Sequence, residues 1–144
     1  MPNSLPPLAT QDERTLAMLG HVLQILTGFL GPLIIALVKR NSRFVVFHCL
    51  QAILWQAAYM VVSILVMVMF FASMLAGVSS QGAAREAPVW LVVAVPGMLV
   101  VSLGGWGLTL VLAIVYAVRA GSGQWAEYPL VGRWAKRLAG LEPG

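Results

Sequence analysis

Residues 44–76 read FVVFHCLQAILWQAAYMVVSILVMVMFFASMLA, a run that contains no Asp, Glu, Lys or Arg. A helix needs about 20 apolar residues to cross the hydrocarbon core of a bilayer. Two further uncharged runs cover residues 15–38 and 87–118. Each run is long enough to cross, so the sequence predicts an all-α integral membrane helical bundle with three transmembrane helices, at about 15–38, 44–76 and 88–118.

The composition agrees with a membrane protein. Of the 144 residues, 60% are hydrophobic and 10% are charged, whereas soluble domains carry about 25% charged residues. The nine Lys and Arg residues lie in short segments beside the uncharged runs. The net charge of +4 is therefore interpreted as a topology signal rather than as a surface for nucleic acid.

The ends of the transmembrane domain, residues 11–119, are marked by local signals. Thr10 and Glu13 have the spacing of a capping box, so the first helix is expected to begin there, after an extended tail over residues 1–10. The third span contains Pro96 and several glycines. One long, kinked span is favoured, and a broken pair of helices is the alternative.

After the last span, residues 124–144 are expected to form a short amphipathic helix at the membrane interface, with a solvated tail as the alternative. Leu130, Trp134 and Leu138 follow one another at helical spacing, with basic residues on the other face. The expected interfacial residues are Trp125, Tyr128, Arg133, Trp134, Lys136 and Arg137.

The distribution of basic residues predicts an orientation, because cytoplasmic loops are enriched in Lys and Arg. With three spans, seven of the nine bases share one side and only Arg14 and Arg85 face the other. The predicted location is the bacterial cytoplasmic membrane, with the N-terminus outside and the C-terminus in the cytoplasm.

Polar and small residues recur at helical spacing within the spans. An unpaired polar group in hydrocarbon costs several kcal/mol, so such stripes are expected to face other helices, and small residues allow helices to approach closely. A ligand, a partner subunit or a polar path is the alternative. The candidate residues for helix packing or partner binding are His21, Gln24, His48, Gln51, Trp55, Tyr59, Gly97, Gly105, Thr109 and Ala113.

Two histidines suggest haem, but the predicted topology argues against shared ligation. With a continuous first span and an antiparallel second span, His21 and His48 would lie roughly 20 Å apart along the membrane normal. No metal, cofactor-binding or catalytic site is predicted, because the spans contain no carboxylate and the chain has no phosphate loop or nucleophile elbow. Bound lipid is expected.

Several separated motifs together resemble one family. These are residues 12–14 (DER), 17–21 (AMLGH), 31–32 (GP), 47–52 (FHCLQA), 117–123 (AVRAGSG) and 128–129 (YP). The pattern resembles small bacterial polytopic membrane proteins of unknown function that are distantly similar to the chloroplast inner-envelope Tic import component of about twenty kilodaltons. The resemblance implies a compact helical bundle and brings no catalytic residue or cofactor with it.

The leading functional hypothesis is a non-enzymatic scaffold or accessory subunit that binds the bilayer and other membrane subunits. The first alternative is a transport or translocation component resembling the Tic machinery, in which the polar stripe lines a path. The second is a haem-binding or pigment-binding subunit. No partner or substrate can be named from these residues.

Overall fold

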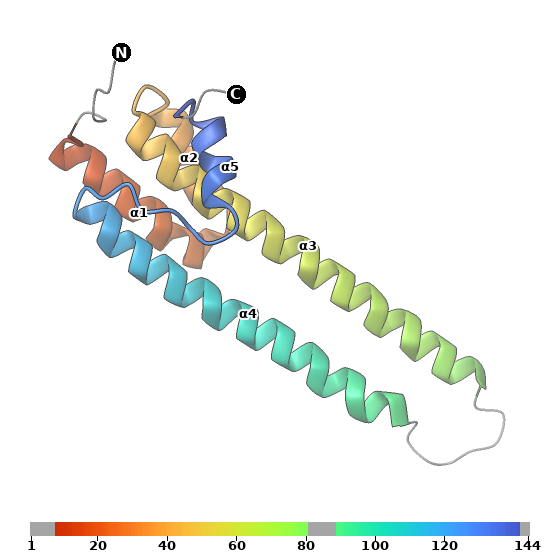
Figure 1. Cartoon of the computed structure of the whole chain (residues 1–144). Coiled ribbons are helices and arrows are strands. Elements are labelled where there is room, and N and C mark those ends of the chain that lie inside the picture. The colour runs from red at the N-terminus through yellow and green to blue at the C-terminus, as the bar shows by residue number, and fades with distance from the viewer. Residues whose placement is uncertain (1–7, 81–88, 142–144) are drawn as a thin grey trace. The chain divides into compact units, whose positions relative to one another are not determined.

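The computed structural model describes residues 8–80 and 89–141. Every secondary-structure element in these described residues is a helix, which confirms the all-α class (Figure 1). The predicted tail over residues 1–10 and the polar connector between the second and third runs lie largely outside the described residues. The helices are α1 (Gln11–Thr27), α2 (Leu30–Val38), α3 (Arg43–Ser80), α4 (Val89–Gly121) and α5 (Gly132–Leu138).

The first predicted span is not one continuous helix. The chain turns at Gly28 and Phe29, and α2 folds back against α1 as a helical hairpin (Figure 1). Gly28 adopts φ 62°, in the left-handed region that favours glycine. With 9 residues, α2 extends only about 14 Å at 1.5 Å per residue, which is too short to cross a bilayer.

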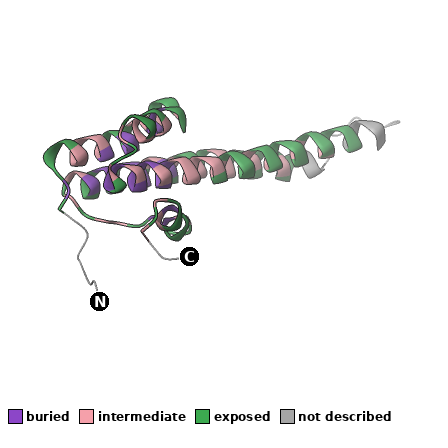
Figure 2. Cartoon of the chain, turned by 90° about the horizontal axis from the view of Figure 1, so that it is seen from above, coloured by how far each residue is buried: buried purple, intermediate pink, exposed green. Residues whose placement is uncertain are grey.

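The chain divides into two compact units. Unit 1 comprises Met1–Ala57 and Thr109–Gly144, and unit 2 comprises Ala58–Leu108. The buried residues, purple in Figure 2, belong to unit 1. Among the described side chains of unit 2, all are exposed or of intermediate burial. Unit 2 therefore shows no protein core of its own in its described part.

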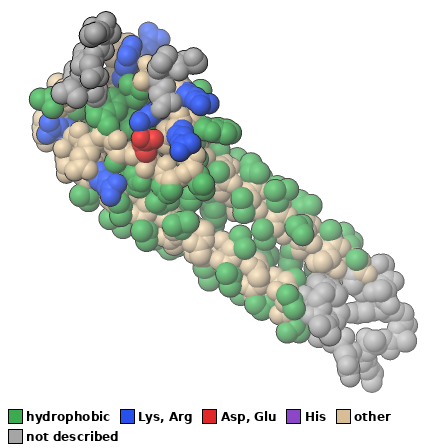
Figure 3. Space-filling view, in the orientation of Figure 1, with side chains coloured by type: hydrophobic (Ala, Val, Ile, Leu, Met, Phe, Trp, Pro, Cys, Tyr) green, Lys and Arg blue, Asp and Glu red, His purple; other side chains and the backbone are tan. Residues whose placement is uncertain are grey.

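Two helices are long and apolar enough to cross a membrane, over Arg43–Ala76 and Val92–Gly121. In their most apolar windows, none of the residues of the first helix and 17% of those of the second are buried, unlike the core helix of a soluble protein. Hydrophobic side chains cover much of the visible face of unit 2 in Figure 3, while the Lys and Arg side chains in view lie over unit 1. The described residues thus contain two candidate spans, and a third is not found.

From Val89 onward the third uncharged run forms one helix, so the alternative of a broken pair is wrong. Pro96 lies inside α4, which continues to Gly121. The spacing of Leu130, Trp134 and Leu138 predicted a helix that includes all three residues, but the observed helix is shorter. Leu130 has φ 75° and therefore cannot belong to a right-handed helix. Only Gly132–Leu138 is helical there.

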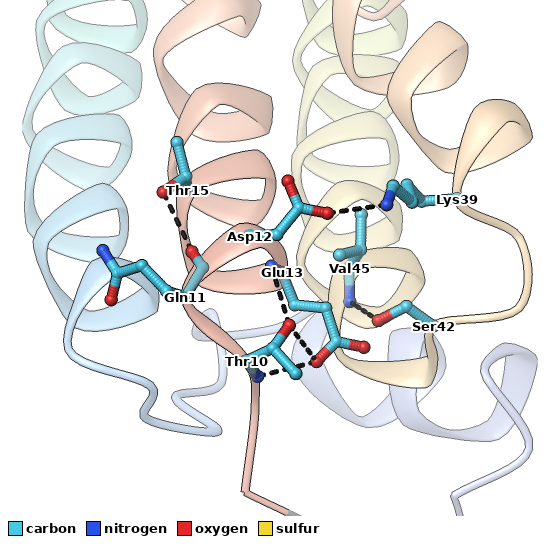
Figure 4. A network of polar contacts seen from close by, with 8 residues as sticks. All are labelled: Thr10, Gln11, Asp12, Glu13, Thr15, Lys39, Ser42 and Val45. Atoms are coloured by element: carbon cyan, nitrogen blue, oxygen red, sulfur yellow. Dashed lines mark hydrogen bonds and ion pairs between the residues drawn. The ribbon is translucent and has the colours of Figure 1, made fainter.

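Helix α1 begins where its sequence predicts (Figure 4). The Glu13 amide donates to the Thr10 hydroxyl at 3.3 Å, and the Thr10 amide donates to the Glu13 carboxylate at 2.8 Å, which completes the capping box. The Lys39 ammonium pairs with Asp12 at 2.6 Å. This ion pair joins the start of α1 to the residue that follows α2.

Candidate functional site

The helices of unit 1 bring the predicted polar stripe together in the interior. His21 and Gln24 come from α1, and His48 and Gln51 come from α3; all four are at most 2% exposed. His21 Nε2 lies 3.1 Å from His48 Nδ1. The expected separation of roughly 20 Å is wrong, because the hairpin turn at Gly28 places α1 parallel rather than antiparallel to α3.

The buried side chains form a chain of hydrogen bonds with one direction. The Gln124 carbonyl can only accept, so His48 Nε2 donates to it at 3.0 Å. Nδ1 of a neutral His48 then accepts from His21 Nε2. His21 Nδ1 accepts in turn from the Tyr128 hydroxyl at 3.0 Å, and this hydroxyl accepts from the Gln24 amide at 3.2 Å. This direction applies to the neutral form of both rings.

A second set of bonds holds the segment after α4 by its backbone. The Gln51 side-chain amide donates to the Ala126 carbonyl at 3.1 Å and accepts from the Tyr128 amide. The Tyr116 hydroxyl donates to the Glu127 carbonyl. One glutamine side chain thus pairs with two peptide groups, as a neighbouring strand would. We refer to residues 124–128 as the clasp.

Aromatic rings pack around the network and the clasp. The rings of His21 and Tyr128 stack with centroids 5.3 Å apart, and the rings of Tyr116 and Tyr128 lie 4.2 Å apart. Trp125 meets the ring of Phe44 edge-on at 5.0 Å. The clasp is therefore held by both apolar contacts and hydrogen bonds.

The remaining members of the predicted stripe bond α3 to α4. In unit 1 the Trp55 indole donates to the Thr109 hydroxyl at 2.9 Å, and Ala113 is fully buried. In unit 2 the Tyr59 hydroxyl donates to the Ser102 carbonyl at 3.0 Å. Both hydrogen bonds join one helix to another within the chain.

The small-residue face of α4 is only partly used for packing in the chain. A Cβ added at Gly105 would overlap the ring of Tyr59, so this position requires glycine. A Cβ at Gly97 would have no atom within 4 Å. Gly105 therefore makes the predicted close contact, whereas Gly97 faces open space.

The predicted interfacial residues take three different environments. Tyr128 is 2% exposed and belongs to the network, so its predicted place at the membrane interface is wrong. Trp125 is half-buried against Phe44, whereas Trp134 is 65% exposed. Lys136 pairs with Glu127 at 2.6 Å, and Arg133 and Arg137 are exposed.

Electrostatics distinguish the interior of the site from its rim. Burial raises the pKa of the Tyr128 hydroxyl, so this group remains a donor at neutral pH. At the exposed rim, the hydrogen bond to Asp12 raises the pKa of Lys39. A side-chain hydrogen bond with Ser42, followed by the backbone hydrogen bond of Thr10, lowers the pKa of Glu13. The rim is charged and the network is neutral.

Most polar atoms of the arrangement bond internally, whereas Gln24 Oε1 is buried without a hydrogen-bond partner. All four ring nitrogens of His21 and His48 have hydrogen-bond partners, so none is left to bind a haem iron. Within the described residues, no group of three or more His, Cys, Asp and Glu side chains could hold a metal ion. Sequence reasoning missed the clasp carbonyls, because a backbone acceptor carries no residue-type signal. It also missed Tyr116, whose hydroxyl donates to one of these carbonyls.

The sequence matches the family described as the magnetosome magnetite crystal formation protein family over residues 12–135. The chain belongs to this family. The matched region of this magnetosome family member extends from α1 into α5 and includes every residue of the network. No curated protein and no solved structure matches the chain.

Family membership refines the expectation from the motifs. The match agrees with the expectation that the chain belongs to a family of small bacterial membrane proteins. The resemblance to the chloroplast Tic component finds no support in these comparisons. The haem-binding or pigment-binding alternative finds none either.

Proposed function

We propose that this magnetosome family member is a non-enzymatic membrane protein that takes part in magnetite crystal formation as a scaffold or accessory subunit. The family match over residues 12–135 carries this proposal. The internal bonding of the network supports it, because these polar groups stabilise the fold rather than face a substrate. The chain would then act through its surfaces.

The outer face of α4 offers a surface for a partner subunit. A Cβ at Gly97 or Gly104 would meet no atom within 4 Å, so both glycines leave shallow places on a helix that is otherwise covered by apolar side chains. In a bilayer, helices associate through such positions because small residues allow close approach. We assign this face to a helix of another membrane protein.

The proposed location is the magnetosome membrane, with both termini on the cytoplasmic side. With two spans, eight of the nine Lys and Arg residues share the side of the termini, and only Arg85 lies between the spans. This distribution is more one-sided than the seven to two of the three-span topology. In this proposal the N-terminus lies in the cytoplasm and not outside, as the three-span topology predicted.

The test uses a magnetite-forming bacterium that carries this gene. Deleting the gene is expected to change the number or size of the magnetite crystals, and the wild-type gene is expected to restore them. Gly97→Leu is expected to restore them poorly while reaching the membrane in normal amounts, because the larger side chain blocks the partner helix. Leu99→Ile, at another exposed position of α4, serves as the matched control.

Two outcomes would contradict the proposal. Crystals that remain unchanged after deletion would remove the role in their formation. Full restoration by Gly97→Leu, together with unchanged co-purification of other membrane proteins in mild detergent, would remove the accessory-subunit role at this face.

A further inference from the structure

The α1–α2 hairpin carries an apolar face that no described residue of unit 1 covers. The exposed fraction reaches 77% at Leu26 and 65% at Leu37. The hairpin has no charged residue between Arg14 and Lys39. The hairpin face consists of Leu26, Phe29, Leu30, Ile34, Leu37 and Val38.

Contacts between α1 and α3 fix the direction in which the hairpin points. A Cβ at Gly20 would lie 2.8 Å from Cys49 Sγ, and His21 bonds to His48. Further along both helices, a Cβ at Gly28 would lie 3.8 Å from Gln56 Nε2. The two helices therefore run parallel, and the hairpin turn lies level with Gln56.

Charge is confined to the open end of the hairpin. Asp12 and Lys39 form an ion pair there, and the polar segment that follows leads into Arg43 at the start of α3. The first candidate span, Arg43–Ala76, continues from this charged end past Gln56. The hairpin thus has its charged end beside the start of α3, and its apolar turn lies level with Gln56, inside the candidate span.

We propose that the hairpin enters the bilayer from the side of the termini and returns to that side without crossing. Lipid acyl chains are the partner of the hairpin face. The 9 residues of α2 reach about 14 Å at 1.5 Å per residue, close to half of a hydrocarbon core of about 30 Å. The turn is placed near the middle of the membrane.

The backbone of the turn is suited to lipid, where polar groups without partners are costly. The Gly31 amide donates to the Thr27 hydroxyl at 3.0 Å, and that hydroxyl donates to the Leu23 carbonyl at 2.8 Å. Pro32 has no amide proton, and the Leu33 amide donates to the Phe29 carbonyl at 3.0 Å. These residues reduce the number of free donors at the start of α2.

The test measures the depth of nitroxide labels in the full-length protein, reconstituted in vesicles of phosphatidylethanolamine and phosphatidylglycerol. Labels are attached at Leu30→Cys and Leu37→Cys, with Leu65→Cys in the span and Asn41→Cys in the polar segment as references. The ratio of collisions with oxygen to collisions with a water-soluble nickel chelate is expected to be high at Leu30, as at Leu65. It should be intermediate at Leu37 and low at Asn41. The unsubstituted chain controls for labelling of the buried Cys49.

Each other outcome overturns the proposal. A label at Leu30 that meets nickel as often as one at Asn41 would place the hairpin in water. A label sheltered from both reagents would show that protein, either another copy or a bound subunit, covers the face. Labelling of Gln11→Cys and Asn41→Cys from opposite sides by an impermeant maleimide would show that the segment crosses the bilayer.

Discussion

At the scale of single residues, the Gln51 side chain makes the most exacting contact of the network. Its amide pairs with the Ala126 carbonyl in a partly buried bond and with the Tyr128 amide in a buried one. Gln51→Leu keeps a similar volume and removes both bonds. Leaving two such groups unpaired is expected to lower the free energy of unfolding by about 2–4 kcal/mol.

The measurement is reversible unfolding in mixed micelles with increasing dodecyl sulfate, followed by tryptophan fluorescence. Gln11→Leu is the matched control, since Gln11 is exposed on the first turn of α1. Equal stability of the two variants would mean that the clasp is held by its aromatic contacts and not by Gln51.

The sequence predicted the two histidines and two glutamines of the network, but neither its two tyrosines nor what these side chains bind. Spacings of three and four placed His48 and Gln51 on one side of a helix, and polar groups in an apolar segment must find partners. Their partners are carbonyls and an amide of the clasp. Every residue type has a backbone carbonyl and all but proline have an amide proton, so no residue pattern could have indicated these partners.

At the scale of helices, the lengths of the uncharged runs correctly predicted the long helices α3 and α4. For the first run they predicted one span, whereas the structure has the two shorter helices α1 and α2. Residues 15–38 are as free of charge as a span, and a hairpin with a lipid-covered face needs the same composition. The sequence contains Gly28, Gly31 and Pro32 in this run, but glycine and proline also occur in kinked membrane helices that cross the bilayer. Only the positive φ of Gly28 and the contacts of α1 with α3 distinguish a reversal from a bend.

Neighbouring glycines of α4 give a prediction about helix packing in unit 2. Gly105→Ala places a methyl group against the ring of Tyr59, so it is expected to destabilise the protein by about 1–3 kcal/mol through overpacking. Gly104→Ala meets no atom within 4 Å, so it should be neutral or stabilising by up to about 1 kcal/mol. The difference between the two free energies of unfolding in mixed micelles checks the contact.

A loss of stability at Gly104 as large as at Gly105 would contradict this packing. It would mean that another molecule covers the outer face of α4 in the isolated protein, as in a dimer that packs against Gly97 and Gly104. Measuring the oligomeric state of the wild-type protein in the same detergent separates these two readings.

At the scale of the whole chain, the number of spans determines where the two termini lie. Ala17 of α1, Phe44 of α3 and Ala120 of α4 share one cluster, so the start of the first helix and the end of the last long helix belong to the same end of unit 1. If α3 and α4 are the two spans, both termini face one side. The excess of basic residues on that side is the basis for the proposal that it faces the cytoplasm.

Reporter fusions at Pro2 and at Gly144 test this topology in a bacterial inner membrane. Green fluorescent protein is expected to fluoresce at both ends, and alkaline phosphatase, which is active only after export, should be inactive at both. The three-span topology instead predicts an exported reporter at the N-terminus and a cytoplasmic one at the C-terminus. This readout is independent of the depth of the hairpin, because a hairpin lying in water leaves the termini on the same side. An exported N-terminal reporter would therefore reject the two-span topology itself, and with it the re-entry of α1 and α2.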